Sequence, residues 1–115
     1  MIVFCSVNDK SRHIGTVYCT TMKPMAGLPR IECLCPTKEL VYGYKYEGKS
    51  DEWYINGYRQ SFASRWVDVK AWLDSLQVDV DATYVCYCKE GKFCHRKLMA
   101  MMLAKHRPDI EVVLH

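Results

Sequence analysis

Long hydrophobic runs and low-complexity tracts are missing from this sequence, and their absence excludes several classes of protein. No run approaches the roughly 18–20 apolar residues that span a bilayer, so we expect no transmembrane segment and no membrane partner. The apolar residues 1–5 have no basic stretch before them and polar residues after them, so we expect no signal peptide. With 115 residues and no repeat or linker, the chain is expected to form a single domain over residues 1–115, in the cytoplasm.

A large excess of charge is also missing. Sixteen basic and thirteen acidic residues give a net charge of +3, which is too small to diagnose a nucleic-acid-binding protein. The positive charge is concentrated in residues 89–107, which hold six basic residues and one acidic residue. This concentration predicts an anionic ligand near the segment. The alternative is a solvated helix face with its cations near the negative C-terminal end of the helix dipole.

Cysteine, in contrast, is abundant, with seven residues in a short chain. Because no secretion signal is present, we expect reduced thiols rather than a disulfide framework. Six residues would supply enough ligands for zinc: Cys33, Cys35, Cys86, Cys88, Cys94 and His95. Structural zinc sites usually place their cysteines on turns with two to four residues between them, whereas a Cys-x-Cys pair within a strand rarely gives tetrahedral geometry. We therefore expect no metal and no cofactor.

Short apolar runs rich in β-branched and aromatic residues predict the strands of the fold. Four such runs occupy residues 2–7, 16–21, 83–88 and 110–114, and a further short strand is expected at residues 31–35. The runs are separated by helical patterns, and this order is typical of an α/β protein. We predict a small Rossmann-like three-layer domain with a mostly parallel sheet of four or five short strands, flanked by helices.

Helical patterns occupy most of the remaining chain. Thr37 is the expected N-cap of a helix over residues 38–46, and Ser50 is the expected N-cap of the next one. Apolar residues then recur at steps of three or four up to residue 76, which predicts a long helix with a kink or break at Gly57 or near residues 61–64. A last helix is expected over residues 94–106.

The segment that carries the most chemistry is predicted as a strand, a loop and the start of the last helix. Ligands of open α/β sheets bind beyond the carboxyl ends of strands, and the free N–H groups at a helix start favour a phosphate or carboxylate. We predict that Arg96 grips this anion, that Cys94 is a nucleophile whose thiol pKa is lowered, and that His95 is a general acid or base. These three residues are the predicted catalytic residues.

A structural role for the same three residues remains open. Cys94 would then pack at a tight strand–helix junction, His95 would cap its own helix, and Arg96 would pair with Glu90 or Asp51. Strict tyrosine-phosphatase chemistry is excluded, because it requires a cysteine followed after five residues by an arginine, and neither strand-end cysteine meets this spacing. Glycine-rich fingerprints for phosphate or dinucleotide binding are lacking.

Residues 86–96, with the pattern Cys-Tyr-Cys-x-x-Gly-x-Phe-Cys-His-Arg, resemble the Cys-His-Arg signature of the family called domain of unknown function 488. Residues 36–45 resemble its Pro-Ser-x-Glu-Leu-x-x-x-Tyr-Lys element, and residues 52–58 resemble the start of its following helix. The resemblance is strong from Pro36 onward and weak before it. Where the family usually has one cysteine at the strand end, this chain has two.

The resemblance implies a small α/β domain of Rossmann-like character and no known reaction. It carries over Lys45 in addition to the Cys-His-Arg residues. A separate argument adds side chains expected at the carboxyl ends of strands or in the adjoining loop, around the same crevice. The predicted ligand-binding residues are Ser6, Asn8, Thr20, Lys45, Cys88 and Lys92.

Hydroxyls, an amide and cations suit a small phosphate-bearing ligand such as a nucleotide or sugar phosphate. Our first hypothesis is a protein that binds such a ligand, with hydrolysis or group transfer as the expected chemistry if it is an enzyme. The second is a non-catalytic binding or inhibitory module of phage type, which acts on a macromolecular partner or sequesters a signalling molecule. The third is a nucleic-acid-binding accessory that uses residues 89–107.

Overall fold

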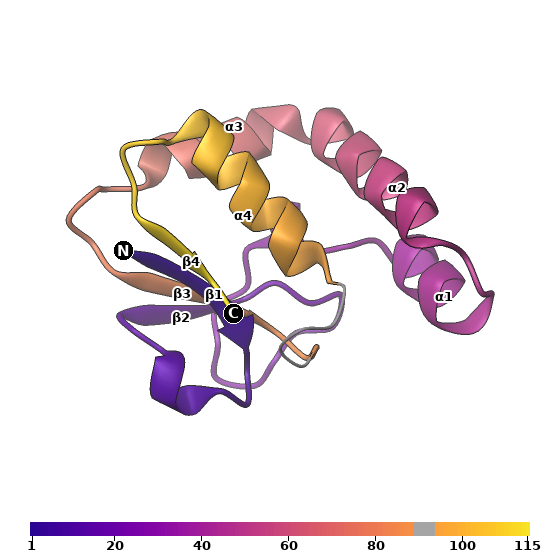
Figure 1. Cartoon of the computed structure of the whole chain (residues 1–115), viewed down its shortest axis with the longest axis horizontal. Coiled ribbons are helices and arrows are strands. Elements are labelled where there is room, and N and C mark those ends of the chain that lie inside the picture. Colours follow the sequence, from indigo (N-terminus) through magenta and orange to yellow (C-terminus); the bar gives the residue numbers. More distant parts are fainter. Residues whose placement is uncertain (89–93) are drawn as a thin grey trace.

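The computed structural model describes residues 1–88 and 94–115, which fold around one sheet (Figure 1). Its strands are β1 (Ile2–Ser6), β2 (Thr16–Cys19), β3 (Ala82–Cys86) and β4 (Val112–Leu114). They lie in the order β2-β3-β1-β4, and every pairing between them is parallel. The predicted α/β class with a parallel sheet flanked by helices is therefore confirmed.

The helices begin where the sequence provides caps. They are α1 (Lys38–Tyr46), α2 (Asp51–Ser64), α3 (Trp66–Ser75) and α4 (His95–His106), with short 3-10 helices η1 (Lys10–Arg12) and η2 (Glu32–Leu34). The Thr37 hydroxyl accepts from the backbone N–H of Leu40 at 3.3 Å, and the Ser50 hydroxyl accepts from that of Trp53 at 3.1 Å. Both predicted caps are confirmed. None of the described helices has the length and apolar character needed to cross a membrane.

The long apolar stripe is broken into two helices at Arg65, next to one of the two predicted positions. The Arg65 guanidinium donates to the backbone carbonyls of Glu32 and Cys35, each at 2.9 Å. The Tyr58 hydroxyl donates to the carbonyl of Leu34. Side chains thus satisfy the backbone groups that a strand would pair. The prediction of a strand at residues 31–35 is therefore wrong, and this segment forms η2 instead.

The sheet is the middle of three layers. Connections from β2 to β3 and from β3 to β4 run in one direction along the sheet and carry the four α-helices, whereas the connection from β1 to β2 runs back and carries η1. Right-handed crossovers place such opposite connections on opposite faces. In Figure 1, α3 and α4 lie on one side of the strands and η1 lies on the other.

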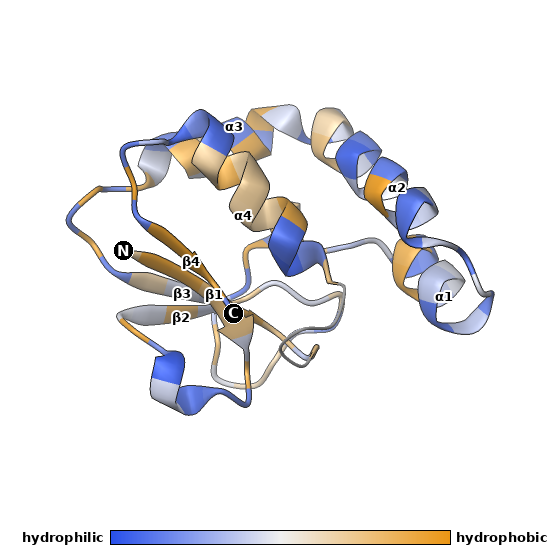
Figure 2. Ribbon diagram, viewed as in Figure 1, coloured by the Kyte–Doolittle hydropathy of each residue, from blue (hydrophilic) through white to orange (hydrophobic). Residues whose placement is uncertain are grey.

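Each face of the sheet has its own hydrophobic core. On the helical face, Phe4 and Tyr84 of the sheet are buried together with Met99 of α4. On the opposite face, Val85 is buried with Met25, which lies in the segment that follows β2. Figure 2 shows that β1 and β4 are largely hydrophobic along their length. Every residue of β1 is buried, as in a strand covered on both faces, whereas the edge strand β4 is only partly buried.

The topology also fixes where a ligand can approach. Neighbouring strands β1 and β3 lead away to opposite faces of the sheet, into η1 and α4 respectively. At their carboxyl ends Ser6 lies opposite Cys86 in register. A crevice opens at such a switch point in open α/β sheets, so the fold places a binding edge where the cysteine-rich segment begins.

Candidate functional site

A cavity of about 340 Å³ lies at the carboxyl edge of the sheet. Its walls come from four parts of the chain: the segment after β2, helix α1 with one residue of α2, the end of β3, and the start of α4. The volume falls in the range of small-ligand pockets, which begins at about 300 Å³. Of the predicted site residues, Lys45, Cys88, Cys94 and His95 line this cavity.

The lining of the cavity is positively charged. Lys23 and Lys45 contribute ammonium groups, and no described residue of the lining is acidic. The start of α4 adds the positive end of the helix dipole and backbone N–H groups without a partner inside the helix. These features together favour an anion over a cation in the cavity.

Tyrosine rings make up much of the remaining wall. Tyr42, Tyr44 and Tyr46 come from α1, Tyr54 comes from α2, and Tyr87 follows β3. Their edges and faces contact one another, with ring centroids 5.7 Å apart between Tyr42 and Tyr46 and 5.3 Å apart between Tyr44 and Tyr54. The exposed Tyr46 ring, with 76 % of its surface accessible, is available for stacking with a planar ligand.

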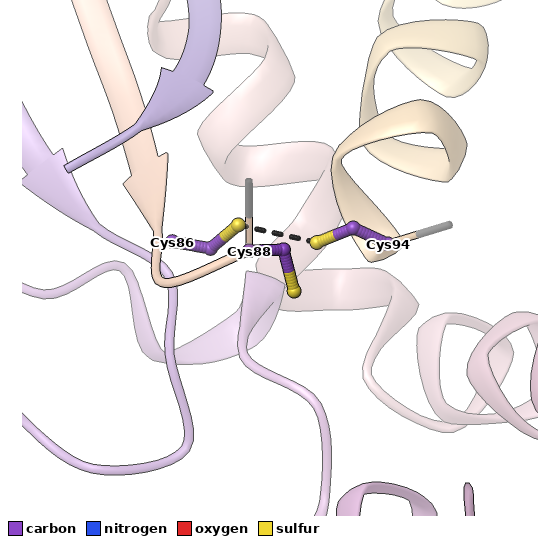
Figure 3. Close-up of side chains that lie close together, drawn as sticks. All are labelled: Cys86, Cys88 and Cys94. Atoms are coloured by element: carbon purple, nitrogen blue, oxygen red, sulfur yellow. Dashed lines mark hydrogen bonds between the residues drawn. The ribbon is translucent and has the colours of Figure 1, made fainter. Parts of the chain in front are cut away.

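Three thiols meet at the end of the cavity next to the sheet. The sulfur atoms of Cys86, Cys88 and Cys94 all lie within 4.8 Å of one another. Figure 3 shows the three side chains side by side, with the Cys86 and Cys94 sulfurs 3.1 Å apart. Cys86 and Cys94 are buried, whereas Cys88 is half-buried and is the most open of the three.

The local fold explains why these thiols converge. The strand β3 ends at Cys86, two residues earlier than predicted, so Cys88 lies beyond the strand and its side chain is not held on the same face of the sheet as that of Cys86. The guanidinium Nη1 of Arg96 donates to the carbonyl of Cys88 at 2.7 Å and anchors its backbone. Cys94 is the N-cap of α4 in an extended conformation, which directs its side chain toward the strand end.

Electrostatics assign the negative charge of this cluster to Cys88. Hydrogen bonds from the Cys86 and Cys94 thiols, assisted by the positive charge of Arg96, hold the pKa of Cys88 well below its ordinary value. At Cys94 the contact with Cys86 lowers the pKa, but donation to Cys88 and burial outweigh it and raise the pKa to about 11. The predicted lowering of the Cys94 pKa is therefore wrong, because the neighbouring Cys88 takes the thiolate.

His95 is a buried, neutral imidazole. Its Nε2 lies 2.8 Å from the carbonyl oxygen of Thr20, so this nitrogen carries the proton and donates. The other nitrogen, Nδ1, lies 3.4 Å from the sulfur of Cys94 and is able to accept from its thiol. Burial lowers the pKa of His95 to about 4. At neutral pH the ring is thus uncharged, with Nδ1 unprotonated, rather than the proton-donating imidazolium that a general acid requires.

Four other predicted residues do not line the cavity: Ser6, Asn8, Thr20 and Arg96. Arg96 is only 2 % exposed and donates to the carbonyl of Cys88, which favours a positioning role over the predicted direct contact with the ligand. Thr20 is fully buried and holds His95, while Ser6 is buried beside Cys86. Asn8 is exposed in the turn after β1, away from the cavity lining. The predicted ligand-binding residue Lys92 lies outside the described residues.

Sequence reasoning missed several residues of the lining. Lys23 follows a strand end but carries no pattern that distinguishes it from other surface lysines. Tyr42 and Tyr46 do carry a signal, since two exposed aromatic rings one helical turn apart next to Lys45 are unusual on a short surface helix. Cys86 was weighed as a zinc ligand and not as part of a ligand cavity.

Comparison with known proteins gives one positive result. A family model named DUF488-N3a, described as the active DUF488-N3 subclade, matches residues 3–107. The curated proteins contain no match to the chain, and the solved structures contain none either. The matched range includes the whole cavity wall and the Cys-His-Arg segment at the start of α4. The chain therefore belongs to the family called domain of unknown function 488.

Proposed function

We propose that this protein binds a nucleotide-like, phosphate-bearing ligand in the cavity at the carboxyl edge of the sheet. One observation carries the proposal: a single cavity of about 340 Å³ combines two lysines, five tyrosines and the start of a helix, with no acidic side chain in its described lining. Cations and helix N–H groups recognise phosphate, and aromatic rings recognise a planar base. Neither feature alone would separate a nucleotide from other anions.

The two halves of the ligand would occupy different walls. The phosphate would lie toward Lys45, Lys23 and the start of α4, which together supply the positive potential. The base would lie against the rings of α1, where Tyr42 and Tyr46 remain accessible. This arrangement would leave the phosphate near the thiol cluster, because Cys94 is the N-cap of α4.

Chemistry at the bound ligand, of the hydrolysis or group-transfer class, is assigned to the thiol end of the cavity. There the sulfurs of Cys86, Cys88 and Cys94 lie next to the unprotonated Nδ1 of His95. The subclade to which the chain matches is described as active, which supports a catalytic rather than a purely structural role.

Thermal-shift measurements on the purified chain test this proposal directly. We expect a panel of nucleoside mono- and diphosphates, cyclic nucleotides and sugar phosphates to contain at least one compound that raises the melting temperature, since a ligand bound only by the folded state stabilises it. The substitution Lys45→Met is expected to lower the affinity for that compound about tenfold, because a charge-assisted contact contributes about 1.5 kcal/mol.

Matched variants identify which wall of the cavity contributes to ligand binding. Lys105→Met removes an exposed cation from the far end of α4 and should leave the affinity unchanged. Tyr42→Leu should lower the affinity for nucleotides while leaving the affinity for sugar phosphates unchanged, because only nucleotides carry a base. If every compound of the panel leaves the melting temperature unchanged, or if Lys45→Met and Lys105→Met behave alike, the cavity is not a phosphate site and the proposal fails.

A further inference from the structure

We infer that Cys86, Cys88 and Cys94 form a binding site for a thiophilic d¹⁰ metal ion such as Zn²⁺, with one coordination position open to the cavity. Ion binding itself rests on the arrangement of the three sulfurs. The role of the ion in chemistry at the bound ligand rests on the proposed function. The inference changes the role of the thiols, from a covalent nucleophile to a set of ligands that hold an ion beside the bound phosphate.

The spacing of the sulfurs fits such an ion. A tetrahedral zinc ion with Zn–S bonds of about 2.3 Å holds its sulfurs about 3.8 Å apart. All three sulfurs lie within 4.8 Å of one another, and the closest pair, Cys86 and Cys94, is 3.1 Å apart. Small side-chain rotations that open the close pair and draw Cys88 inward therefore reach the required geometry.

The donor set selects the kind of ion. Within the described residues this group consists of three cysteines with no carboxylate among its donors. Thiolates bind soft ions and do not suit Mg²⁺ or Ca²⁺, which require oxygen ligands. Three protein ligands with a fourth position left open is the arrangement of catalytic rather than structural zinc sites. All three cysteines line the cavity, so the open position faces the space where the ligand would bind.

The surroundings of the cluster supply positive charge. The start of α4 directs its positive dipole end toward Cys94, its N-cap, and Arg96 places a buried positive charge behind Cys88. Positive charge of this kind favours the thiolate form that a metal ion binds.

Cys86 and Cys88 are free of the geometric limit on a Cys-x-Cys pair within a strand. The strand β3 ends at Cys86 and leaves Cys88 in the bend that follows. The third ligand comes from α4, eight residues beyond Cys86. Two ligands at a strand end and one at a helix start are able to surround an ion, which two ligands on one strand face are not.

An ion at this position would supply Lewis acidity to the ligand. Its open coordination position would accept a phosphate oxygen or a water molecule next to the bound ligand. Metal binding would displace the remaining thiol protons of the cluster.

Cobalt binding provides the test. The reduced chain, stripped with a chelator, is titrated with Co²⁺ under anaerobic conditions and followed by absorption. We expect one equivalent to bind with a thiolate-to-cobalt charge-transfer band in the near ultraviolet and strong visible bands of a tetrahedral site. Added Zn²⁺ should displace Co²⁺ and remove these bands.

Two cysteine variants give a matched comparison. Cys88→Ser removes a half-buried ligand and should weaken Co²⁺ binding by more than the roughly 10–100-fold typical of losing a supporting partner of a metal ligand. Cys33→Ser removes a partly buried thiol outside the cluster and should bind Co²⁺ like the unaltered chain. A thermal melt of each variant verifies its fold. If Co²⁺ fails to bind, or binds both variants equally, the metal site is refuted.

The two proposals fail independently. The nucleotide thermal shift is repeated with a chelator and with Zn²⁺. Ion binding without any nucleotide-induced shift refutes the proposed function and keeps the metal site. A nucleotide-induced shift that is the same with chelator and with Zn²⁺, in a chain that does not bind Co²⁺, refutes the metal site and keeps the ligand cavity. A shift that grows with Zn²⁺ supports both.

Discussion

The chain contains two Cys-x-Cys pairs, and the fold treats them in opposite ways. Cys33 and Cys35 lie in and next to η2, where burial raises the pKa of both thiols, to about 11 for Cys35. Cys86 and Cys88 lie at the end of β3 and meet a third thiol from α4 in front of a cavity. The same spacing is thus a packing element in one place and a candidate site in the other.

The difference comes from partners rather than from the pair itself. Around Cys35 burial outweighs the neighbouring positive charge: desolvation raises the pKa of the thiol more than Arg30 lowers it, and Arg65 is engaged with the Cys35 carbonyl. Around Cys88 the partners are a second and a third sulfur and a buried guanidinium. A cysteine pair becomes reactive when the fold adds charge, a third ligand and access to it.

The largest expected contrast is in alkylation rates. In the metal-free chain we expect the iodoacetamide reaction of Cys88 to be nearly independent of pH from 6 to 9, because its thiol is already ionised in this range. The reaction of Cys35, whose pKa is about 11, should rise about tenfold per pH unit, or about 1,000-fold over the same range. Mass spectrometry of each modified cysteine measures both rates. Parallel pH profiles for the two thiols would remove the distinction between the pairs.

The second prediction concerns Tyr58, which contacts both η2 and His95 beside the thiol cluster. Its hydroxyl donates to Leu34 between Cys33 and Cys35, and its ring lies 5.6 Å from the ring of His95. Tyr58→Ala removes a fully buried ring and should lower the free energy of unfolding by about 3–5 kcal/mol. Urea denaturation measures the loss.

The conservative variant separates the two contacts. Tyr58→Phe keeps the ring beside His95 and leaves only the Leu34 carbonyl without its donor, which should cost about 1–3 kcal/mol. Its Co²⁺ binding should match that of the unaltered chain. Weaker Co²⁺ binding in Tyr58→Phe would mean that η2 supports the thiol cluster and that the two regions are not independent.

A third prediction concerns acid stability on the side of the thiol cluster. The pKa of His95 is lowered by burial from 6.5 to about 4, so below pH 6.5 the unfolded chain takes up a proton that the folded chain does not. Stability should therefore fall as pH decreases from about 6.5 to 4, with a total contribution of about 3 kcal/mol from this group. The metal-free His95→Gln variant should lose less stability over this range, as measured by urea denaturation at pH 7 and pH 4.5. Equal losses would place an ordinary, solvated histidine at this position.

The smallest expected effect is that of a substitution in the Cys33–Cys35 pair. Cys33 is partly buried, and Cys33→Ser should change the free energy of unfolding by no more than about 1 kcal/mol. Nucleotide-induced thermal shifts should also remain as in the unaltered chain. A loss of ligand-induced stabilisation in Cys33→Ser would extend the functional site into η2.

Local sequence patterns predicted most of the fold. Short apolar runs rich in β-branched and aromatic residues located the four strands of the described structure, and Thr37 and Ser50 marked two helix starts, because these signals depend on neighbours within a few residues. The segment at residues 31–35 was mispredicted, since its conformation is set by side chains from α2 and from the α2–α3 junction, more than twenty residues away. A local sequence pattern carries no information about such distant partners.

The candidate site was predicted in part for the same reason. The strand-to-helix segment correctly brought Cys88, Cys94 and His95 to one cavity, because consecutive elements lie close together. Which thiol carries the charge depends on how three sulfurs and Arg96 are arranged, and spacing along the chain does not reveal it. Burial turned Arg96 from an expected ligand contact into a support for the Cys88 backbone.

The parallel register of the central strand has a consequence for how the molecule assembles. Residues Ile2–Ser6 pair on one side with Ala82–Cys86 and on the other with Val112–Leu114, so their partners lie about 80 and 110 positions later in the chain. The strand β1 therefore leaves the ribosome well before its partners and waits unpaired until they have been synthesised, and such distant pairings are slow to form. During that interval both edges of β1 need protection from aggregation.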